Sequence, residues 1–361
     1  MAATDPTPKA TVVPFTPELL RAVRAFSERY WNRPREDAYY EWRYLAPQLF
    51  SRMFVALQGE ECVGTLFALR KTWRIRGEVL DCHEVFDWHS LAELRGSGLG
   101  IRLMRAVMRL PERVFSVGGT ADVHSTLPLM GWQQLGTANA YELPLSPGLI
   151  AERLHRSKGV PRWLAHAAMV PLAGPAFRPR RLPGPAQGTV EIASELSPEV
   201  ARLYEEDSGY GMVQQPDPDV LRWLTASRWS GSWRYLHFRV AGKLRGWTMT
   251  RTYLGKTGVQ SSILEVFSPR ATPETYAWMV AETALALLAD RPTRILARAI
   301  CPAYREALAR NRFRHAGVDS PLFTWPKFRD DAPAHPHFTF LHSDAPILPY
   351  VTEQSGSGEH V

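Results

Sequence analysis

Three glycines within five residues, Gly96, Gly98 and Gly100, form the segment of this 361-residue chain that is best suited to chemistry. Glycine adopts positive φ freely and lets backbone N–H groups approach a ligand without a Cβ in the way. A helix-period run, residues 101–110, follows at once, so the loop lies at the amino-terminal end of an amphipathic helix, where N–H groups and the helix dipole attract anions. The segment predicts a phosphate-binding loop, with a simple glycine-rich helix start as the structural alternative.

Spacing alone leaves the phosphate ligand open, although it argues against two common loops. The segment lacks the lysine and Ser/Thr of a P-loop, and its third glycine comes one position too early for a dinucleotide-binding GxGxxG loop. Arg95-x-x-Gly98-x-Gly100 instead closely resembles the Q/R-x-x-G-x-G/A pattern of the GNAT acetyltransferase superfamily. The elements expected over about residues 54–143 follow the family order: strand hairpin, strand, loop, helix, strand, and a helix with a Gly-aromatic ending.

The resemblance implies a coenzyme site. In the GNAT superfamily the loop backbone holds the pyrophosphate of acyl-coenzyme A, and we expect the strand before the loop to contact the coenzyme as well. The expected coenzyme-binding residues are Val85, Phe86, Arg95, Gly96, Ser97, Gly98, Leu99 and Gly100. No spacing of His, Asp or Glu indicates a set of metal ligands, so acetyl-CoA is the expected co-substrate and no metal is expected.

The resemblance also implies a general base, because many GNAT enzymes use a carboxylate on the strand that leads to the loop. Glu84 occupies that position, and in an alternating strand over residues 79–86 it shares a face with Cys82 and Phe86. Glu84 is therefore the predicted base. A shared structural role is the alternative, because Glu265 repeats this residue in a second block of the chain.

The usual proton donor to the leaving thiolate is missing. In the family it is a tyrosine four residues before the Gly-aromatic pair, a position that falls here on Leu127, before Gly131. Leucine cannot donate a proton. His124 or Ser125 could substitute, or both could be ordinary helix residues.

The step from the strand to the loop is longer than the family pattern. Asp87 and His89 fall in this step, between Val85 and Arg95. We therefore predict that they lie on an insertion at the mouth of the site, where they are solvated loop residues or contact substrate.

A second block of the chain repeats the order of elements in the first. Strand-like runs cover residues 235–240, 244–252 and 259–267, and Glu84-Val85-Phe86 recurs as Glu265-Val266-Phe267, which favours an internal duplication. In place of the glycine loop, residues 271–276 contain no glycine and have an acid, Glu274, where pyrophosphate would lie. This copy is expected to be degenerate. Aromatic residues before the first strand of each block are predicted to be core or to stack on an acceptor.

The net charge of +7 is concentrated in one segment. Residues 146–186 contain seven basic residues and one acidic residue, leaving about +1 for the rest of the chain, so the charge does not predict nucleic-acid binding. Prolines mark the segment as a linker. Residues 148–170 could form one or two basic amphipathic helices that pack on the protein or touch a membrane surface.

Other features of the composition exclude several classes of protein. No apolar run is long enough to span a bilayer, and the amino terminus lacks the pattern of a secretory signal, so a cytoplasmic location is expected. The three cysteines, an odd number without CxxC spacing, favour neither a disulfide framework nor a zinc site.

The predicted fold is therefore α/β, with a mixed, mostly antiparallel sheet in each of two tandem GNAT-like acyl-CoA N-acyltransferase domains. The expected boundaries are 1–145 for the domain with the coenzyme loop, 146–188 for the basic Pro-rich linker, 189–330 for the degenerate domain and 331–361 for a partly disordered tail.

The expected activity is that of an N-acetyltransferase, which moves an acetyl group from acetyl-CoA to an amine or hydroxyl of a small molecule or saccharide by direct attack. Two alternatives remain: a non-catalytic GNAT-derived binding or scaffold protein, and an aminoacyl-tRNA-dependent transferase of tandem GNAT fold. The intact coenzyme loop argues against the second, because such proteins need none. The sequence does not determine the acceptor or the oligomeric state.

Overall fold

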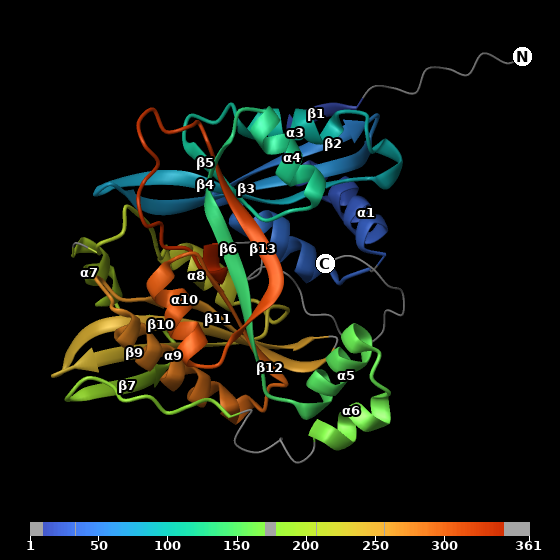
Figure 1. The fold of residues 1–361 in the computed structure, drawn as a ribbon. Coiled ribbons are helices and arrows are strands. Elements are labelled where there is room, and N and C mark those ends of the chain that lie inside the picture. Colours follow the sequence, from blue (N-terminus) through green and yellow to red (C-terminus); the bar gives the residue numbers. More distant parts are fainter. Residues whose placement is uncertain (1–9, 33, 170–177, 207, 256, 343–361) are drawn as a thin grey trace, which may run out of the picture.

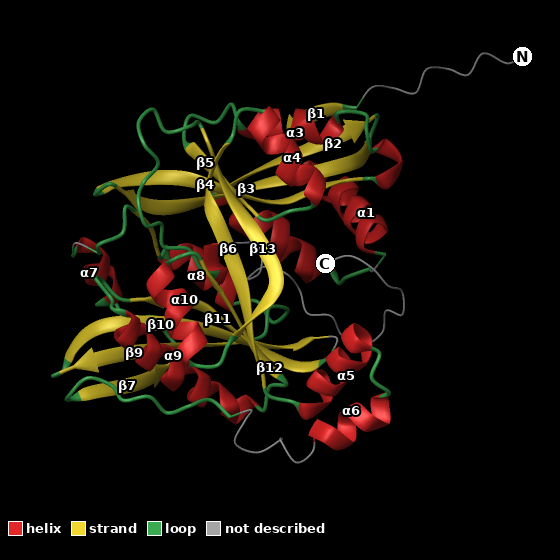
Figure 2. Ribbon diagram, viewed as in Figure 1, coloured by secondary structure: helices red, strands yellow, loops and turns green. Residues whose placement is uncertain are grey.

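Two halves of the chain repeat one order of strands and helices in the computed structural model, which describes residues 10–32, 34–169, 178–206, 208–255 and 257–342 (Figures 1 and 2). The first half consists of β1 (Thr11–Pro14), α1 (Leu20–Trp31), α2 (Asp37–Tyr40), β2 (Ser51–Gln58), β3 (Glu61–Ile75), β4 (Glu78–Ser90), α3 (Leu99–Val107), β5 (Arg113–Val117), α4 (Ala121–Leu129) and β6 (Gln133–Pro144). Short turns η1 (Pro17–Leu19), η2 (Glu41–Leu45), η3 (Ala46–Leu49) and η4 (Ala92–Leu94) connect them.

The second half follows the same order, with one added short strand. It consists of β7 (Gly188–Ala193), α7 (Val200–Glu205), β8 (Met212–Gln215), α8 (Pro218–Thr225), β9 (Ser232–Val240), β10 (Lys243–Gly255), β11 (Gly258–Phe267), α9 (Pro273–Leu287), η6 (Leu288–Asp290), β12 (Arg294–Ala299), α10 (Pro302–Arg310), β13 (Arg314–Trp325) and η7 (Phe340–His342). Between the halves, α5 (Pro147–Lys158) and α6 (Arg162–Met169) form a helical hairpin, so the first part of the predicted linker is helical.

The halves share one 13-stranded mixed sheet because they exchange their last strands. The order is β1-β2-β3-β4-β5-β13-β6-β12-β11-β10-β9-β7, and β8 pairs with β3. Thus β6 of the first half pairs with β12 of the second, β13 pairs with β5, and β6 and β13 lie side by side in the middle of the molecule (Figure 1). Each half therefore completes its sheet with a strand from the other.

An aromatic contact between η2 and α8 also joins the halves. Trp42 Nε1 donates to Trp223 O at 3.0 Å, and Trp223 Nε1 donates to Trp42 O at 2.8 Å. The two rings stack with centroids 5.4 Å apart. The residues are 181 positions apart, as are Glu84 and Glu265, so the contact relates matching positions of the two halves. These early aromatic residues belong to the core between the halves.

The end of the described chain is also part of the core. Phe338, Phe340 and Leu341 are buried, and the backbone of this segment is held by hydrogen bonds from His337 N to Met212 O and from Ile300 N to Phe338 O. Residues 340–342 form a buried turn, η7, beside β11 and β12. Residues 343–361 of the predicted disordered tail lie outside the described residues.

Candidate functional site

The glycine loop is open at the amino-terminal end of α3. Gly98 is the N-cap residue of this nine-residue helix, with φ +73°, and Gly96 has φ +82°. A Cβ placed on either residue would meet nothing within 4 Å. Within the described part of the chain, no protein group accepts a hydrogen bond from the N–H groups of Gly98, Gly100 or Ile101. The loop therefore presents free donors at the positive end of a helix dipole.

The strand before the loop fixes the loop's position. Trp88 Nε1, on β4, donates to Gly100 O at 3.1 Å. A Cβ on Gly100 would lie 3.3 Å from this indole nitrogen, so a glycine allows the close approach. This hydrogen bond joins the start of α3 directly to β4 and so fixes the position of the loop.

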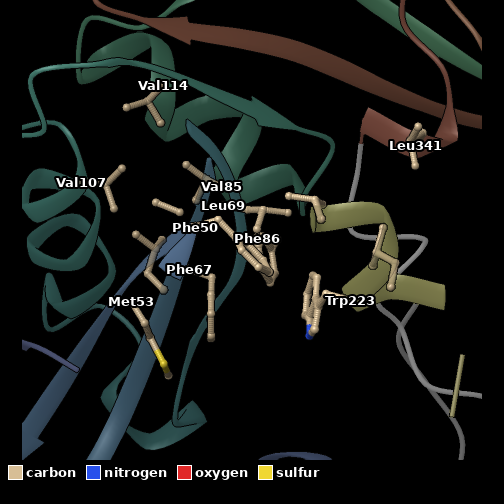
Figure 3. Packing of buried hydrophobic residues seen from close by; sticks show 14 of the residues in the cluster. Phe50, Met53, Phe67, Leu69, Val85, Phe86, Val107, Val114, Trp223 and Leu341 are labelled. Atoms are coloured by element: carbon tan, nitrogen blue, oxygen red, sulfur yellow. The ribbon is translucent and has the colours of Figure 1, made fainter. Parts of the chain in front are cut away.

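Strands β4 and β5 diverge beside the loop. They pair in parallel from Cys82↔Arg113 to Val85↔Ser116 and no further. At the same place β4 has a bulge: its register with β3 shifts, and Asp87 has φ +50°. Of the predicted coenzyme contacts on this strand, Val85 and Phe86 are buried, and Phe86 stacks on Phe67 with centroids 4.9 Å apart, facing Trp223 of α8 across the core (Figure 3).

The prediction that Asp87 and His89 lie on an insertion is wrong, because β4 continues to Ser90 through the bulge. Asp87 is buried against the equally buried Arg43 of η2, whose Nε donates to Asp87 Oδ2 at 3.2 Å. Burial raises the pKa of Asp87, but the charges of Arg43 and His89 and their hydrogen bonds lower it further, to about 2. Asp87 is therefore an anion held by a buried cation. The sequence pattern did not indicate that Asp87 belongs to β4, because a bulge adds residues to a strand without ending it.

His89 lies between this carboxylate and two exposed aromatic side chains. Its Nε2 is 3.7 Å from Asp87 Oδ1. Its ring stacks on Tyr30 at 4.5 Å between centroids and meets the edge of Trp31 at 5.2 Å. Both aromatic residues belong to the end of α1 and are exposed, at 39% and 47%. A titratable ring is thus accessible on the strand that leads to the glycine loop.

Glu84 lies deeper than His89. It is buried, with Oε2 3.7 Å from Lys71 Nζ, and Lys71 also donates to Leu341 O at 3.3 Å. The segment at the end of the described chain thus covers the surroundings of Glu84. Leu127, at the position of the family tyrosine, is buried on α4, where Ser125 Oγ donates to Asp122 O within the helix.

Glu265, the counterpart of Glu84, binds the same terminal segment. It accepts from His337 Nε2 at 2.9 Å and from Thr339 Oγ1 at 3.2 Å, and His342 Nε2 lies 3.2 Å away. The backbone N–H of Val266 also donates to it, at 2.8 Å. Burial raises the pKa of Glu265, but the charges of His337 and His342 lower it well below the ordinary range of a glutamate. This carboxylate has a structural role, because it holds residues 337–342 in the core.

The start of α9 differs from the start of α3. Thr272 Oγ1 accepts from Thr275 N at 3.3 Å, so a side chain already caps the helix. Glu274 accepts from Arg310 Nη1 at 2.8 Å, which places a carboxylate in the first turn. The chain's own groups thus occupy this helix end, whereas the start of α3 is open.

Among the described residues, no group of three or more His, Cys, Asp or Glu could hold a metal ion. No helix in the described ranges has both the length and the apolar character needed to cross a bilayer.

Comparison with protein families decides the identity of the first half. Residues 11–113, which include β4 and the glycine loop, match the model of the acetyltransferase (GNAT) domain. This part of the chain is similar to a GNAT acetyltransferase domain. The match confirms the resemblance drawn from the loop spacing, and it supports acyl-CoA-dependent acyl transfer as the general activity. A comparison with curated proteins finds no match.

Solved structures show the GNAT fold over most of the chain. A conserved protein of unknown function from Enterococcus faecalis, described as a probable N-acyltransferase, has a TM-score of 0.58 at 11% identity over 88% of this chain and 72% of its own. A GCN5-related N-acetyltransferase from Anabaena variabilis has a TM-score of 0.57 at 12% identity, with the same coverage. Saccharomyces cerevisiae N-myristoyltransferase with bound myristoyl-CoA has a TM-score of 0.58 at 11% identity over 92% and 82%. The predicted fold class is confirmed.

Proposed function

We propose that the protein is an acyl-CoA-dependent N-acyltransferase whose first half binds the coenzyme. The observation that carries this proposal is the open glycine loop on α3, with unused N–H donors beside the point where β4 and β5 diverge. The pyrophosphate would accept hydrogen bonds from residues 96–101, and the acyl-bearing arm would extend along β4 past Phe86 and Val85. We propose acetyl as the transferred group and an amine of a small molecule or saccharide as the acceptor, with a hydroxyl as the second choice.

The second half is proposed to be a degenerate copy with a supporting role. Glu274, in the first turn of α9, repels an anionic ligand by its charge. The side chain of Thr272 also accepts a hydrogen bond from Thr275 N, a backbone donor that an anion would otherwise use. The proposed domains remain 1–145 and 189–330, joined by 146–188. Because β6 and β13 are exchanged, each domain supplies a strand to the other's sheet, and the second half stabilises the coenzyme-binding half.

A calorimetric titration with acetyl-CoA tests the coenzyme site. The wild-type protein is expected to bind with a micromolar Kd, and Gly98→Glu is expected to weaken binding at least tenfold, because it places a carboxylate and a strained backbone in the loop. Gly59→Glu is the matched control: Gly59, in the turn between β2 and β3, has φ +63° and equally open surroundings. Gly59→Glu therefore introduces a similar backbone strain at a position away from the loop.

The result is decisive in either direction. Loss of binding in Gly98→Glu with wild-type affinity in Gly59→Glu supports the proposed site. No binding by the wild-type protein, or an equal loss in both variants, overturns it. Release of free thiol in the presence of a panel of amines then separates a transferase from a scaffold protein, which would bind acetyl-CoA but release thiol no faster than background hydrolysis.

A further inference from the structure

We propose that His89, oriented by Asp87, is the general base that takes the proton from the acceptor's ammonium group. This inference rests on the proposed acyl transfer and assigns a catalytic residue that the sequence analysis placed elsewhere, at Glu84. It follows from the arrangement of charged and aromatic groups on β4, η2 and α1.

The first step concerns how His89 is held. Arg43 and Asp87 are both buried, and Arg43 holds Asp87 through Oδ2. The other carboxylate oxygen, Oδ1, is 3.7 Å from His89 Nε2. A carboxylate beside one ring nitrogen of a histidine fixes its orientation and stabilises the imidazolium that forms when the other nitrogen accepts a proton. Nδ1 of His89 is the nitrogen left for the acceptor.

The second step concerns where His89 lies relative to the glycine loop. Burial and the charge of Asp87 raise the pKa of Tyr30, whereas the charge of Arg95 lowers it, so both charges lie close to the phenol on which His89 stacks. Arg95 begins the glycine loop. Direct contacts support this neighbourhood: His89 stacks on Tyr30, and Arg29, the residue before Tyr30, pairs with Glu93, two residues before Arg95.

Other charged groups border this neighbourhood. Arg29, on the same helix as Tyr30, pairs with Glu61 at the start of β3 and with Glu93 of η4. These pairs are exposed at the surface, whereas Asp87 and Arg43 are buried. Asp87 is thus the anion that acts most directly on His89, and Arg43 prevents it from taking up the proton itself.

The third step is accessibility. The His89 side chain is 24% exposed, and the aromatic residues around it are exposed as well. Glu84 is buried beside Lys71, and Leu341 covers that region. The Glu84 side chain is 4% exposed, so an amine reaches it less readily than it reaches His89.

The surroundings of His89 also indicate the class of acceptor. Tyr30 is stacked between Phe26 and His89, so the aromatic ring left for an acceptor is that of Trp31, which is 47% exposed. Aromatic faces attract ammonium groups and stack on flat apolar bodies. The proposed acceptor is therefore a primary amine on an aromatic or apolar body.

The chemical step balances without any further reagent. His89 Nδ1 removes a proton from the ammonium group, and the nitrogen lone pair attacks the carbonyl carbon of the thioester. A C–N bond forms and the C–S bond breaks, so the electron pair of that bond leaves with sulfur. The amine nitrogen then passes its second proton by way of solvent to the thiolate, so the coenzyme leaves as the thiol, and the imidazolium returns the first proton to solvent.

The test measures kcat/KM as a function of pH for the wild-type protein and its variants. Acetyl-CoA is the acyl donor and phenethylamine is the probe amine. His89→Gln is expected to lower kcat/KM at least 100-fold, as general-base catalysis contributes about 10²- to 10⁴-fold, and to abolish the acidic limb of the profile. Its Kd for acetyl-CoA is expected to stay within twofold of the wild-type value. His315→Gln is the matched control, because His315 pairs with Asp319 at 2.7 Å on the exposed first part of β13.

Two outcomes overturn the assignment. One is a pH profile of kcat/KM that keeps its acidic limb in His89→Gln. The other is the loss of that limb in Glu84→Gln, which would make Glu84 the base. If the wild-type protein turns over and His89→Gln has the same kcat/KM, His89 is not the base, but the proposed function is retained. Absence of turnover with any amine in the wild-type protein rejects both.

Discussion

The ion pair between Arg43 and Asp87 is the residue-scale feature on which the geometry of β4 depends. Both side chains are buried, and Asp87 lies at the bulge with φ +50°. An ion pair of this kind contributes little over an apolar pair of the same size, yet loss of one partner is costly because the other charge stays buried. The pair thus fixes the bulge and, in our proposal, the base beside it.

Asp87→Asn is therefore expected to lower the free energy of unfolding by about 3–5 kcal/mol. Asparagine tolerates the positive φ, so the loss reports the missing charge opposite Arg43. Denaturant unfolding measures the change, with Asp319→Asn as the control, because Asp319 pairs with His315 at the surface and such pairs contribute at most about 1 kcal/mol. A loss below about 1 kcal/mol in Asp87→Asn would show that the pair is not needed for the fold.

At the scale of elements, the α5–α6 hairpin carries four of the seven basic residues of the segment 146–186. Ala165 of α6 faces the protein, while Trp163 and Leu164 are 72% and 46% exposed. Arg156 and Arg162 both pair with Glu152 on the same surface. An exposed tryptophan beside cations is the pattern of a helix that lies on an anionic lipid surface.

We expect the protein to sediment with vesicles of phosphatidylcholine and phosphatidylglycerol, and not with phosphatidylcholine alone. Trp163→Ala is expected to lower the bound fraction severalfold, because the indole is the largest apolar group that this hairpin exposes. Leu129→Ala is the control, since Leu129 on α4 is 89% exposed outside the hairpin. Equal binding of Trp163→Ala and the wild-type protein, or no binding to anionic vesicles, would assign the hairpin a purely structural role.

Elements whose signals are local could be predicted from the sequence, and others could not. The glycine loop and the helix after it depend on neighbouring residues, so their pattern is visible in residues 95–110. The end of β4 could not be predicted, because its last residues pair with β3 only after the bulge at Asp87 shifts the register. The burial of residues 337–342 depends on Glu265, which is distant in sequence.

At the scale of the whole molecule, the two halves form one interlocked unit. The sequence predicted the repeated order of elements, but the exchange of β6 and β13 depends on pairing between distant strands, which alternation alone does not specify. The reciprocal hydrogen bonds of Trp42 and Trp223 and the buried terminal segment add contacts across the same boundary. The half with the coenzyme loop is therefore expected to need the other half in order to fold.

A pair of truncations tests the contribution of the terminal segment. A chain that ends at His335 lacks the buried side chains of Phe338 and Leu341, each of which contributes about 1.5–3 kcal/mol, and leaves Glu265 without His337 and His342. We expect it to lose at least about 5 kcal/mol of unfolding free energy relative to a chain that ends at His342. Thermal and denaturant unfolding of the two truncated chains measure this difference, and a difference below about 1 kcal/mol would contradict the structural role of the segment.

The central claim is that acyl-CoA binds to the first half and not to the second. Hydrogen exchange with and without acetyl-CoA tests it most directly, because the claim depends on backbone N–H groups. We expect slower exchange at residues 96–101 on addition of acetyl-CoA and unchanged exchange at residues 272–276. Unchanged exchange at residues 96–101, or protection at the start of α9 instead, would contradict it.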